Sequence, residues 1–315
     1  MARRKLKTVT RTQGNNQALK DGSVQPASFE FDFEDVPVLV DGFRRMVRGN
    51  EFDVCEMALT TYLCAKAHGK RFTALPIFLV RGFHHGAILV NRNAGIRQPK
   101  DIEGRRLGVN RGYTVTTGVW ARGVLQSEHD VALDQVTWVL SGDEHVAEYR
   151  PPANVVPLEK GRKMDEVVAA GELDGVINLQ IEHPDVVPLI PDAEEAGYRA
   201  LRERGHYPAN HLVVVRDELL AGEPGLAAEV FEAFAESKRR YVRQLQAGAI
   251  EKPTAVDRMH RRVIEITGSD PLPYGIAPNR PMLEELMAHA AAQKIIDRPM
   301  RIEDLFAPAT HRLQA

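Results

Sequence analysis

The chain alternates between short apolar runs and longer segments in which apolar residues recur every three or four positions. The short runs are bounded by turn-forming residues and predict strands, whereas the longer segments have the period of an amphipathic helix. The predicted strands are 5–10, 75–80, 87–90, 107–109, 136–140, 175–179 and 211–216. The predicted helices are 41–48, 57–68, 116–128, 164–170, 227–246, 256–267 and 281–294. Strands that alternate with helices in this way predict an α/β protein with largely parallel sheets.

The pattern also divides the chain, because the strand and helix segments become shorter after Pro99. A length of 315 residues suits about two domains. We predict a discontinuous first lobe of residues 1–98 and 211–315, and an inserted second lobe of residues 99–210. Two lobes joined by crossover strands leave a cleft between them, which is a common place for a ligand.

Composition excludes several classes of protein. The net charge of −2 and the pI of about 6.6 provide no overall field that would attract nucleic acid. The sequence has no apolar run of about 18 residues and no apolar region after its basic N-terminus, which predicts a cytoplasmic protein without a membrane span. Cys55 and Cys64 are predicted on opposite faces of one helix, which argues against a disulfide. A homo-oligomer is compatible with the sequence but is not predicted by it.

The segment 106–122 carries the clearest chemical signal. A strand that ends at Val109 is followed by a loop and then by a helix that begins near Thr116 and Thr117. The first backbone N–H groups of a helix lack intrahelical partners, and the helix dipole is positive there, so such a terminus attracts anions. The two threonines suit both N-capping and anion binding, and the sequence does not separate these roles. The segment predicts a protein that binds a small carboxylate or phosphate.

Five segments occur in an order that resembles a known family. They are Asp53-Val-Cys-Glu-Met, Asp101-Ile-Glu-Gly-Arg-Arg-Leu-Gly-Val, Trp120-Ala-Arg-Gly-Val-Leu, Asn210-His-Leu-Val-Val-Val-Arg and Asp270-Pro-Leu-Pro-Tyr-Gly-Ile-Ala-Pro-Asn-Arg. Together they resemble the 4,5-dihydroxyphthalate decarboxylase family. The resemblance implies a type II periplasmic binding-protein-like fold and a cytoplasmic enzyme that removes CO2 from a small hydroxylated aromatic carboxylate. No cofactor is expected.

Loss of CO2 from a phenolic acid needs a proton donor at the ring carbon that bears the carboxylate. Glu56 and His85 match the family's glutamate and histidine, and His211 begins a strand where the chain crosses between the predicted lobes. We therefore expect Glu56, His85 and His211 to carry the catalysis. Each has an alternative role: Glu56 could complement a helix dipole, His85 could be a solvated or structural loop residue, and His211 could be a hydrogen-bonded core residue.

The same three residue types also bind zinc and other divalent ions. Glu56, His85 and His211 have no metal-binding spacing, and they come from three distant segments of the chain. A divalent metal held by these side chains therefore stands as an alternative to metal-free acid–base chemistry.

Two arginines are candidates for holding the substrate carboxylate, because a guanidinium can pair with a carboxylate through two hydrogen bonds. These are Arg81 and Arg122, and Trp120 lies two residues before Arg122 on the same predicted helix. Residues two apart do not share a helix face, so only one of Trp120 and Arg122 is expected to face the substrate. The alternative for each arginine is a salt bridge on the surface.

A different class of protein offers a second interpretation. The same fold serves solute-binding proteins, so the chain could bind a small carboxylate without catalysis, as a sensor or as part of a transporter. The family segments favour the enzyme. The expected absence of a signal peptide and of a lipid-anchor cysteine argues against a transporter component.

Overall fold

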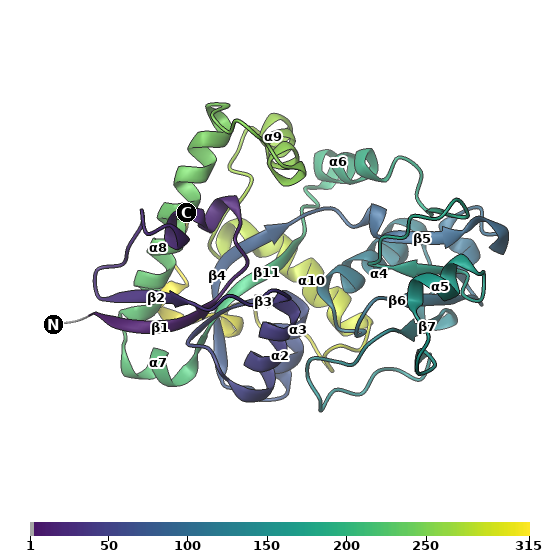
Figure 1. Ribbon diagram of the computed structural model, residues 1–315, viewed down its shortest axis with the longest axis horizontal. Helices are drawn as coiled ribbons and strands as arrows, with labels where there is room; N and C mark the ends of the chain where they lie inside the picture. The colour runs from purple at the N-terminus through teal and green to yellow at the C-terminus, as the bar shows by residue number, and fades with distance from the viewer. Residues whose placement is uncertain (1–2) are drawn as a thin grey trace. The chain divides into compact units, whose positions relative to one another are not determined.

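A computed structural model of the protein describes residues 3–315 (Figure 1). Contacts between residues divide the chain into two compact units. Unit 1 comprises residues 3–82, Ala209–Glu284 and Met300–Ala315. Unit 2 comprises Phe83–Pro208 and Glu285–Pro299. Each unit has one β-sheet with helices of its own.

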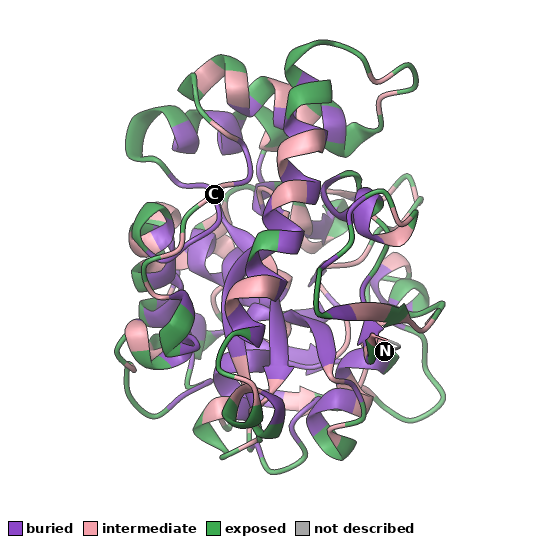
Figure 2. Ribbon diagram, turned by 90° about the vertical axis from the view of Figure 1, so that its left-hand side faces the viewer, coloured by how far each residue is buried: buried purple, intermediate pink, exposed green. Residues whose placement is uncertain are grey.

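The sheet of unit 1 has five strands in the order β2-β1-β3-β11-β4. They are β1 (Arg4–Val9), β2 (Phe29–Phe33), β3 (Val54–Ala58), β4 (Phe72–Arg81) and β11 (Ala209–Arg216). Strand β1 is parallel to β2 and β3, whereas β11 is antiparallel to both β3 and β4. All five residues of β3 are buried, as is typical of a central strand, and Figure 2 shows this burial along the middle of the sheet.

Helix α8 packs on this sheet through one apolar face. The helices of unit 1 are α1 (Gln17–Lys20), α2 (Leu39–Gly49), α3 (Leu59–Ala67), α7 (Asp217–Gly222), α8 (Leu226–Gln246) and α9 (Ala255–Thr267). Phe231 and Phe234 of α8 lie three residues apart on one helical face, and both are fully buried against Leu6 and Val213 of the sheet. Burial of a phenylalanine side chain contributes roughly 1.5–3 kcal/mol, so this face holds α8 against the strands.

The sheet of unit 2 has six strands in the order β10-β5-β9-β6-β7-β8. They are β5 (Ile88–Asn91), β6 (Arg106–Val109), β7 (Thr137–Leu140), β8 (Val155–Pro157), β9 (Gly175–Ile177) and β10 (Val186–Pro188). Strands β9, β6, β7 and β8 are parallel, whereas β5 is antiparallel to β9 and β10. The helices are α4 (Thr116–His129), α5 (Met164–Ala169) and α6 (Ala193–Arg204), and buried Met164 and Val168 of α5 pack on the sheet residues Val139 and Val176.

The remaining helices are α10 and a set of short 3-10 turns. Helix α10 (Arg280–Ala292) belongs to both units, since the division falls between Glu284 and Glu285. The 3-10 helices are Gly14–Asn16, His85–Ala87, Arg92–Ala94, Pro99–Ile102, Leu133–Gln135, Ala277–Asn279, Glu303–Leu305 and Pro308–Thr310. Within residues 3–315, no helix has the length and apolar composition that a membrane span needs.

The two units have different bounds from the predicted lobes. The prediction assigns residues 83–98 to the first lobe, but they group with unit 2, where β5 pairs with β9 and β10. It also assigns residues 285–299 to the first lobe, but this segment groups with unit 2, where Gln293 bonds to Arg122. In both cases the partners that decide the grouping lie far away in the sequence, so local periodicity carries no sign of them.

The largest local correction concerns the predicted helix 57–68. This helix begins at Leu59, and Glu56 and Met57 lie in strand β3 instead. Pairing of β3 with β1 on one side and β11 on the other stabilises the extended backbone and overrides the local helical pattern. Cys55 and Cys64 are both free thiols, which confirms that they form no disulfide, although one lies in β3 and the other in α3.

The prediction of largely parallel sheets is wrong at β11 and β5, which run antiparallel to both of their neighbours. Each of these strands follows a point where the chain passes from one unit to the other. A strand that enters a sheet from the other unit is not joined to its neighbouring strand by a crossover helix. No connection therefore requires the two strands to be parallel. The sequence interpretation also lacks the short elements β2, β8, β10, α6 and α7.

Candidate active site

Unit 1 brings together two of the predicted catalytic residues, Glu56 on β3 and His211 on β11. The two strands pair with Glu56 opposite Val213. His211 is two positions from Val213, so it occupies the diagonal position on the same face of the sheet as Glu56. His211 Nδ1 lies 2.7 Å from Glu56 Oε1, and the Glu56 side chain is completely buried. The strand register therefore builds a carboxylate–imidazole pair.

Three further contacts fix this pair. The backbone N–H of Arg11 donates to Glu56 Oε2 at 2.8 Å, and Gln13 Nε2 lies 3.5 Å from both carboxylate oxygens. The Phe43 ring meets the His211 ring at nearly a right angle, with centroids 5.2 Å apart. Because Nδ1 is bonded to the carboxylate, Nε2 is the ring atom that can exchange a proton with a ligand. The His211 side chain is 18% exposed whereas Glu56 is 0% exposed, so the imidazole is the member of the pair that a ligand can reach.

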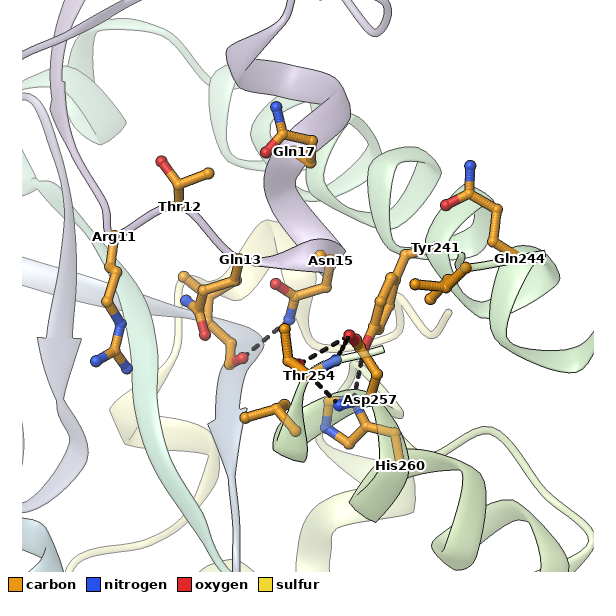
Figure 3. Close-up of a pocket in the computed structure, with 14 residues that line it drawn as sticks. Arg11, Thr12, Gln13, Asn15, Gln17, Tyr241, Gln244, Thr254, Asp257 and His260 are labelled. Atoms are coloured by element: carbon orange, nitrogen blue, oxygen red, sulfur yellow. Dashed lines mark hydrogen bonds between the residues drawn. The ribbon is translucent and has the colours of Figure 1, made fainter. Parts of the chain in front are cut away.

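A cavity of about 550 Å³ adjoins the pair within unit 1 (Figure 3). The loop after β1 forms one wall, and helices α8 and α9 contribute much of the rest. Arg11 and Gln13 line the cavity and also bond to Glu56, so one loop borders both features. Among the described residues that line the cavity, neither Glu56 nor His211 is found.

Arg81 is the residue of unit 1 that is predicted to bind the substrate carboxylate, and its side chain is hydrogen-bonded within the protein. It is the last residue of β4 and is 6% exposed. Its guanidinium donates to the side-chain oxygen of Asn279 and lies 3.5 Å from the carbonyl oxygen of Pro273. Asn279 in turn donates to the carbonyl oxygens of Pro273 at 2.9 Å and Gly275 at 2.8 Å. Burial excludes the surface salt bridge as its role, and a contact with substrate stays a prediction.

His84 and His85 in unit 2 contact different partners. His85 is fully buried, and its Nε2 lies 3.1 Å from both carboxylate oxygens of Glu128. Arg204 bonds to the same carboxylate. The His84 ring stacks on Trp120 with centroids 6.2 Å apart. His85 is therefore paired with a carboxylate of its own unit, so it is not a solvated loop histidine. Its catalytic role stays a prediction, beside the structural alternative.

Trp120 is surrounded by histidines of unit 2. The rings of His206 and His289 meet it edge to face, with centroids 5.6 Å and 5.7 Å away. His206 Nδ1 lies 3.0 Å from Glu285 Oε1, and His289 Nε2 lies 3.7 Å from the same atom. Burial acts against ionisation of Glu285, but the hydrogen bonds and charges of the two histidines outweigh it and lower its pKa to about 2. This carboxylate is held as an anion.

The predicted anion site at the start of α4 contains an acceptor from the chain itself. The Glu144 carboxylate accepts the backbone N–H groups of Tyr113 at 2.5 Å and Thr114 at 3.2 Å, and the Thr114 hydroxyl at 2.7 Å. Gly112 is needed for this approach, because a Cβ there would lie 2.6 Å from Glu144 Oε2. The loop before α4 therefore holds the carboxylate of Glu144, and the binding of a small carboxylate or phosphate by this segment stays a prediction.

Thr116 and Thr117 do not act as the N-cap of α4. The N-cap residue is Val115, which has no side-chain cap bond, and both threonines follow it inside the first turn. The prediction that either threonine caps the helix is therefore wrong by one or two positions. Their predicted contact with a substrate anion stays a prediction.

Arg122, like Glu56, is a completely buried charged side chain of the candidate set. It is 0% exposed, which excludes the surface salt bridge as its role. Its Nε donates to Gln293 at 2.8 Å and its Nη2 donates to the carbonyl oxygen of Tyr113 at 2.6 Å. The guanidinium carbon lies 3.8 Å from the centre of the Tyr113 ring. Burial lowers the pKa of Arg122, and its contacts place it as support for the loop that holds Glu144.

The predicted metal ligands do not form a cluster that the structure describes. Within residues 3–315, no group of three or more His, Cys, Asp or Glu side chains is placed to hold a metal ion. Glu56 and His211 are brought together as a pair, while His85 contacts Glu128 in the other unit.

The sequence interpretation missed several residues that complete these sites, namely Gln13, Glu144, His206, Glu285 and His289. Only one pair of them carries a local signal: Glu285 and His289 are four positions apart, so they share a face of α10. The others approach their partners through the tertiary fold alone.

Comparison with known proteins bears on the family and the fold of the chain. No family model matches the chain. A curated 4,5-dihydroxyphthalate decarboxylase of Comamonas testosteroni is 29% identical over 284 residues, covering 85% of this chain and 86% of that protein. Another of the same name, from Pseudomonas putida, is 32% identical over 176 residues, covering 50% of this chain and 68% of that protein.

Among solved structures, the periplasmic aliphatic sulphonate-binding protein of Escherichia coli matches 99% of this chain and 100% of its own at a TM-score of 0.52 and 9% identity. That likeness shows the fold, which is the α/β, type II periplasmic binding-protein-like fold that the sequence predicts. The extent of the match to the two decarboxylases shows the family as well: the chain belongs to the 4,5-dihydroxyphthalate decarboxylase family and is an enzyme of the carboxy-lyase class.

Proposed function

We propose that the protein removes CO2 from a hydroxylated aromatic carboxylate such as 4,5-dihydroxyphthalate, without oxidation. The names of the two curated relatives support this substrate class. The observation that carries the proposal is the Glu56–His211 pair, because it joins a fully buried carboxylate to an imidazole that a ligand can reach.

The proposed reaction begins with proton transfer from His211 Nε2 to the ring carbon that bears the carboxylate. A C–H bond forms, and electron release from a ring hydroxyl stabilises the dearomatised intermediate. The C–C bond to the carboxylate then breaks, its electron pair returns to the ring, and CO2 leaves. His211 regains its proton from water, so one proton is consumed for each CO2 released. A positioned acid–base group contributes on the order of 100- to 10,000-fold to such a step.

Glu56 has two roles in this proposal. Its carboxylate accepts from Nδ1, which fixes the ring orientation and the tautomer of His211. It also stabilises the positive charge that the imidazole carries before it donates its proton. The Arg11 N–H and Gln13 hold the carboxylate in place for both roles.

The proposal is tested by measuring CO2 release from 4,5-dihydroxyphthalate and from a small panel of phenolic acids, with and without a chelator. We expect release in both conditions, and loss of release in His211→Asn. Release that the chelator abolishes would support a divalent metal held by Glu56 and His211 in place of proton transfer. A thermal shift with a panel member but no release would support a binding protein without catalysis.

A further inference from the structure

A short helical segment holds the loop whose backbone contacts Glu56. The N–H of Arg11, in the loop after β1, donates to Glu56 Oε2 at 2.8 Å. The 3-10 helix Gly14–Asn16 and helix α1 follow this loop directly. One side chain of each, Asn16 and Lys20, donates back to a carbonyl oxygen of the loop. The contacts that hold the carboxylate in place therefore extend beyond the residues that bond to it.

Asn16 bonds to both loop residues that contact Glu56. It is completely buried, its Oδ1 accepts the N–H of Gln13 at 2.8 Å, and its Nδ2 donates to the carbonyl oxygen of Arg11 at 2.9 Å. The N–H of Asn16 also donates to the carbonyl oxygen of Gln13 at 3.1 Å, which closes the 3-10 turn. The bond to Arg11 lies outside this turn, so stabilising the turn does not account for it. It fixes the residue whose N–H donates to Glu56.

Lys20 fixes the peptide group that carries this N–H. Its Nζ donates to the carbonyl oxygen of Thr10 at 2.5 Å. That carbonyl and the N–H of Arg11 belong to one planar trans peptide, so they point in opposite directions, one to Lys20 and the other to Glu56. A cationic donor at the carbonyl polarises the peptide and strengthens its N–H as a donor. Burial lowers the pKa of Lys20, while the negative charge of Glu56 acts in the opposite direction, so the ammonium and the carboxylate attract each other.

We propose that Asn16 and Lys20 are positioning residues of the carboxylate–imidazole pair, which act on it through the backbone of Arg11. The two side chains orient the N–H of Arg11. That N–H holds the carboxylate of Glu56, which in turn orients the ring of His211. A small displacement of a catalytic group has a large effect on the rate, because the reaction needs a narrow range of geometries. The effect on turnover rests on the proposed function, whereas the effect on the geometry of the pair does not.

The first test compares the turnover of 4,5-dihydroxyphthalate by the full chain in Asn16→Ala, Lys20→Met and wild type. We expect kcat to fall about tenfold in each variant, because each loses hydrogen bonds to the loop while the other side chain still holds it. KM should change by less than about twofold, since neither side chain contacts the substrate in the proposal. Asn15→Ala is the matched control: Asn15 is buried beside Asn16, but its side chain donates to the carbonyl oxygen of Leu79 at 2.9 Å. This control should lose stability in urea and keep its kcat within about twofold of wild type.

A spectroscopic measurement separates the geometry of the pair from its activity. The histidines of the full chain are isotopically labelled, and nitrogen NMR follows the Nδ1 signal of His211, which responds to the bond with Glu56. The signal is identified by its absence in His211→Asn. We expect it to move in Asn16→Ala and Lys20→Met, and to match wild type in Asn15→Ala. In turnover, Glu56→Gln/Lys20→Met should lose no more than Glu56→Gln alone, because Lys20 acts through Glu56.

An unchanged kcat and an unchanged His211 signal in both variants would overturn the proposal. A fall in kcat without a change in the signal, or an equal fall in Asn15→Ala, would also overturn it, because the loss would then not arise through the pair. Lys20 is half-buried, so Lys20→Met decides the question if the fully buried Asn16 cannot be replaced without unfolding. If wild type releases no CO2 but the His211 signal moves in both variants, the proposed function fails and the positioning role stands.

Discussion

Glu56 in unit 1 and Glu144 in unit 2 are both carboxylates that accept backbone N–H groups, but their other partners differ. Glu56 accepts from Arg11 and is bonded to the imidazole of His211. Glu144 accepts from Tyr113 and from both the N–H and the hydroxyl of Thr114. One carboxylate therefore has an imidazole as its partner, and the partners named for the other are backbone N–H groups and a hydroxyl.

Under the proposed mechanism, this difference separates a pair that transfers protons from a carboxylate that holds a loop in place. In the proposed mechanism, His211 is the proton donor and Glu56 is the carboxylate that orients it. Glu144 can only satisfy the donors of its loop, as a ligand anion would do in its place. Sequence analysis predicts carboxylate chemistry in both regions, and the identity of the hydrogen-bond partners decides which of them can support acid–base catalysis.

The largest expected effect comes from removing the imidazole of His211. In His211→Asn, the side-chain amide can still donate to Glu56, but it cannot exchange a proton. We expect CO2 release to fall by about 100- to 10,000-fold, because this is the range that positioned acid–base groups contribute. The rate is measured under saturating substrate, and circular dichroism checks that the fold is retained. A rate within a few-fold of wild type would remove His211 from the mechanism.

The next effect comes from Glu56→Gln, which keeps a side-chain acceptor for Nδ1 but removes the charge. We expect a loss of about 100-fold in turnover, near the lower end of the acid–base range. The double variant Glu56→Gln/His211→Asn should lose no more than His211→Asn alone, because the two residues act as one unit. Multiplied losses in the double variant would show that Glu56 and His211 act independently. Glu144→Gln is the matched control and should retain most of the activity.

A smaller effect, on stability, is expected at Glu144. Glu144→Ala leaves two backbone N–H groups and the Thr114 hydroxyl without their acceptor, which should lower the free energy of unfolding by about 1–3 kcal/mol. Urea denaturation measures this change. Sulfate should recover part of it in the variant but not in wild type, because the vacated loop can then bind an external anion.

Glu159→Ala is the control for this prediction, since Glu159 is 81% exposed and lies at the edge of the ion-pair distance from Arg162. It should change stability by a few tenths of a kcal/mol at most. If Glu144→Ala resembled Glu159→Ala, the contacts of Glu144 with the loop would contribute nothing to stability.

The sequence predicts the fold class and most long elements, because amphipathic periodicity survives wherever an element buries one face. The prediction fails at Glu56, because pairing with β1 on one side and β11 on the other stabilises its strand. Local propensity contains no information about such distant neighbours. For the site, residue type and family resemblance identify Glu56 and His211 as candidates. The pairing of these two depends on the register of β3 and β11, and Glu144 reaches Thr114 across 30 positions of sequence. Such contacts exist only in the folded chain.

The smallest expected effect concerns Glu285. It tests whether contact with a histidine is enough to hold a carboxylate as an anion, as we propose for Glu56. Glu285 contacts His206 and His289, but its side chain is 31% exposed whereas Glu56 is fully buried. Its pKa of about 2 lies below the ordinary 4.5, so its contribution to stability is complete above pH 4.5 and is lost as the pH falls toward 2.

Glu285→Gln removes this contribution at neutral pH, so the variant should be less stable than wild type there. The difference between the two should shrink as the pH falls through the window from 4.5 to 2, because wild type alone loses the ionised Glu285. Urea denaturation at several pH values within this window measures the difference. A difference that stays constant would mean that Glu285 is not held as an anion by its histidines. A histidine contact would then not be enough to hold a carboxylate as an anion, which is the role proposed for Glu56.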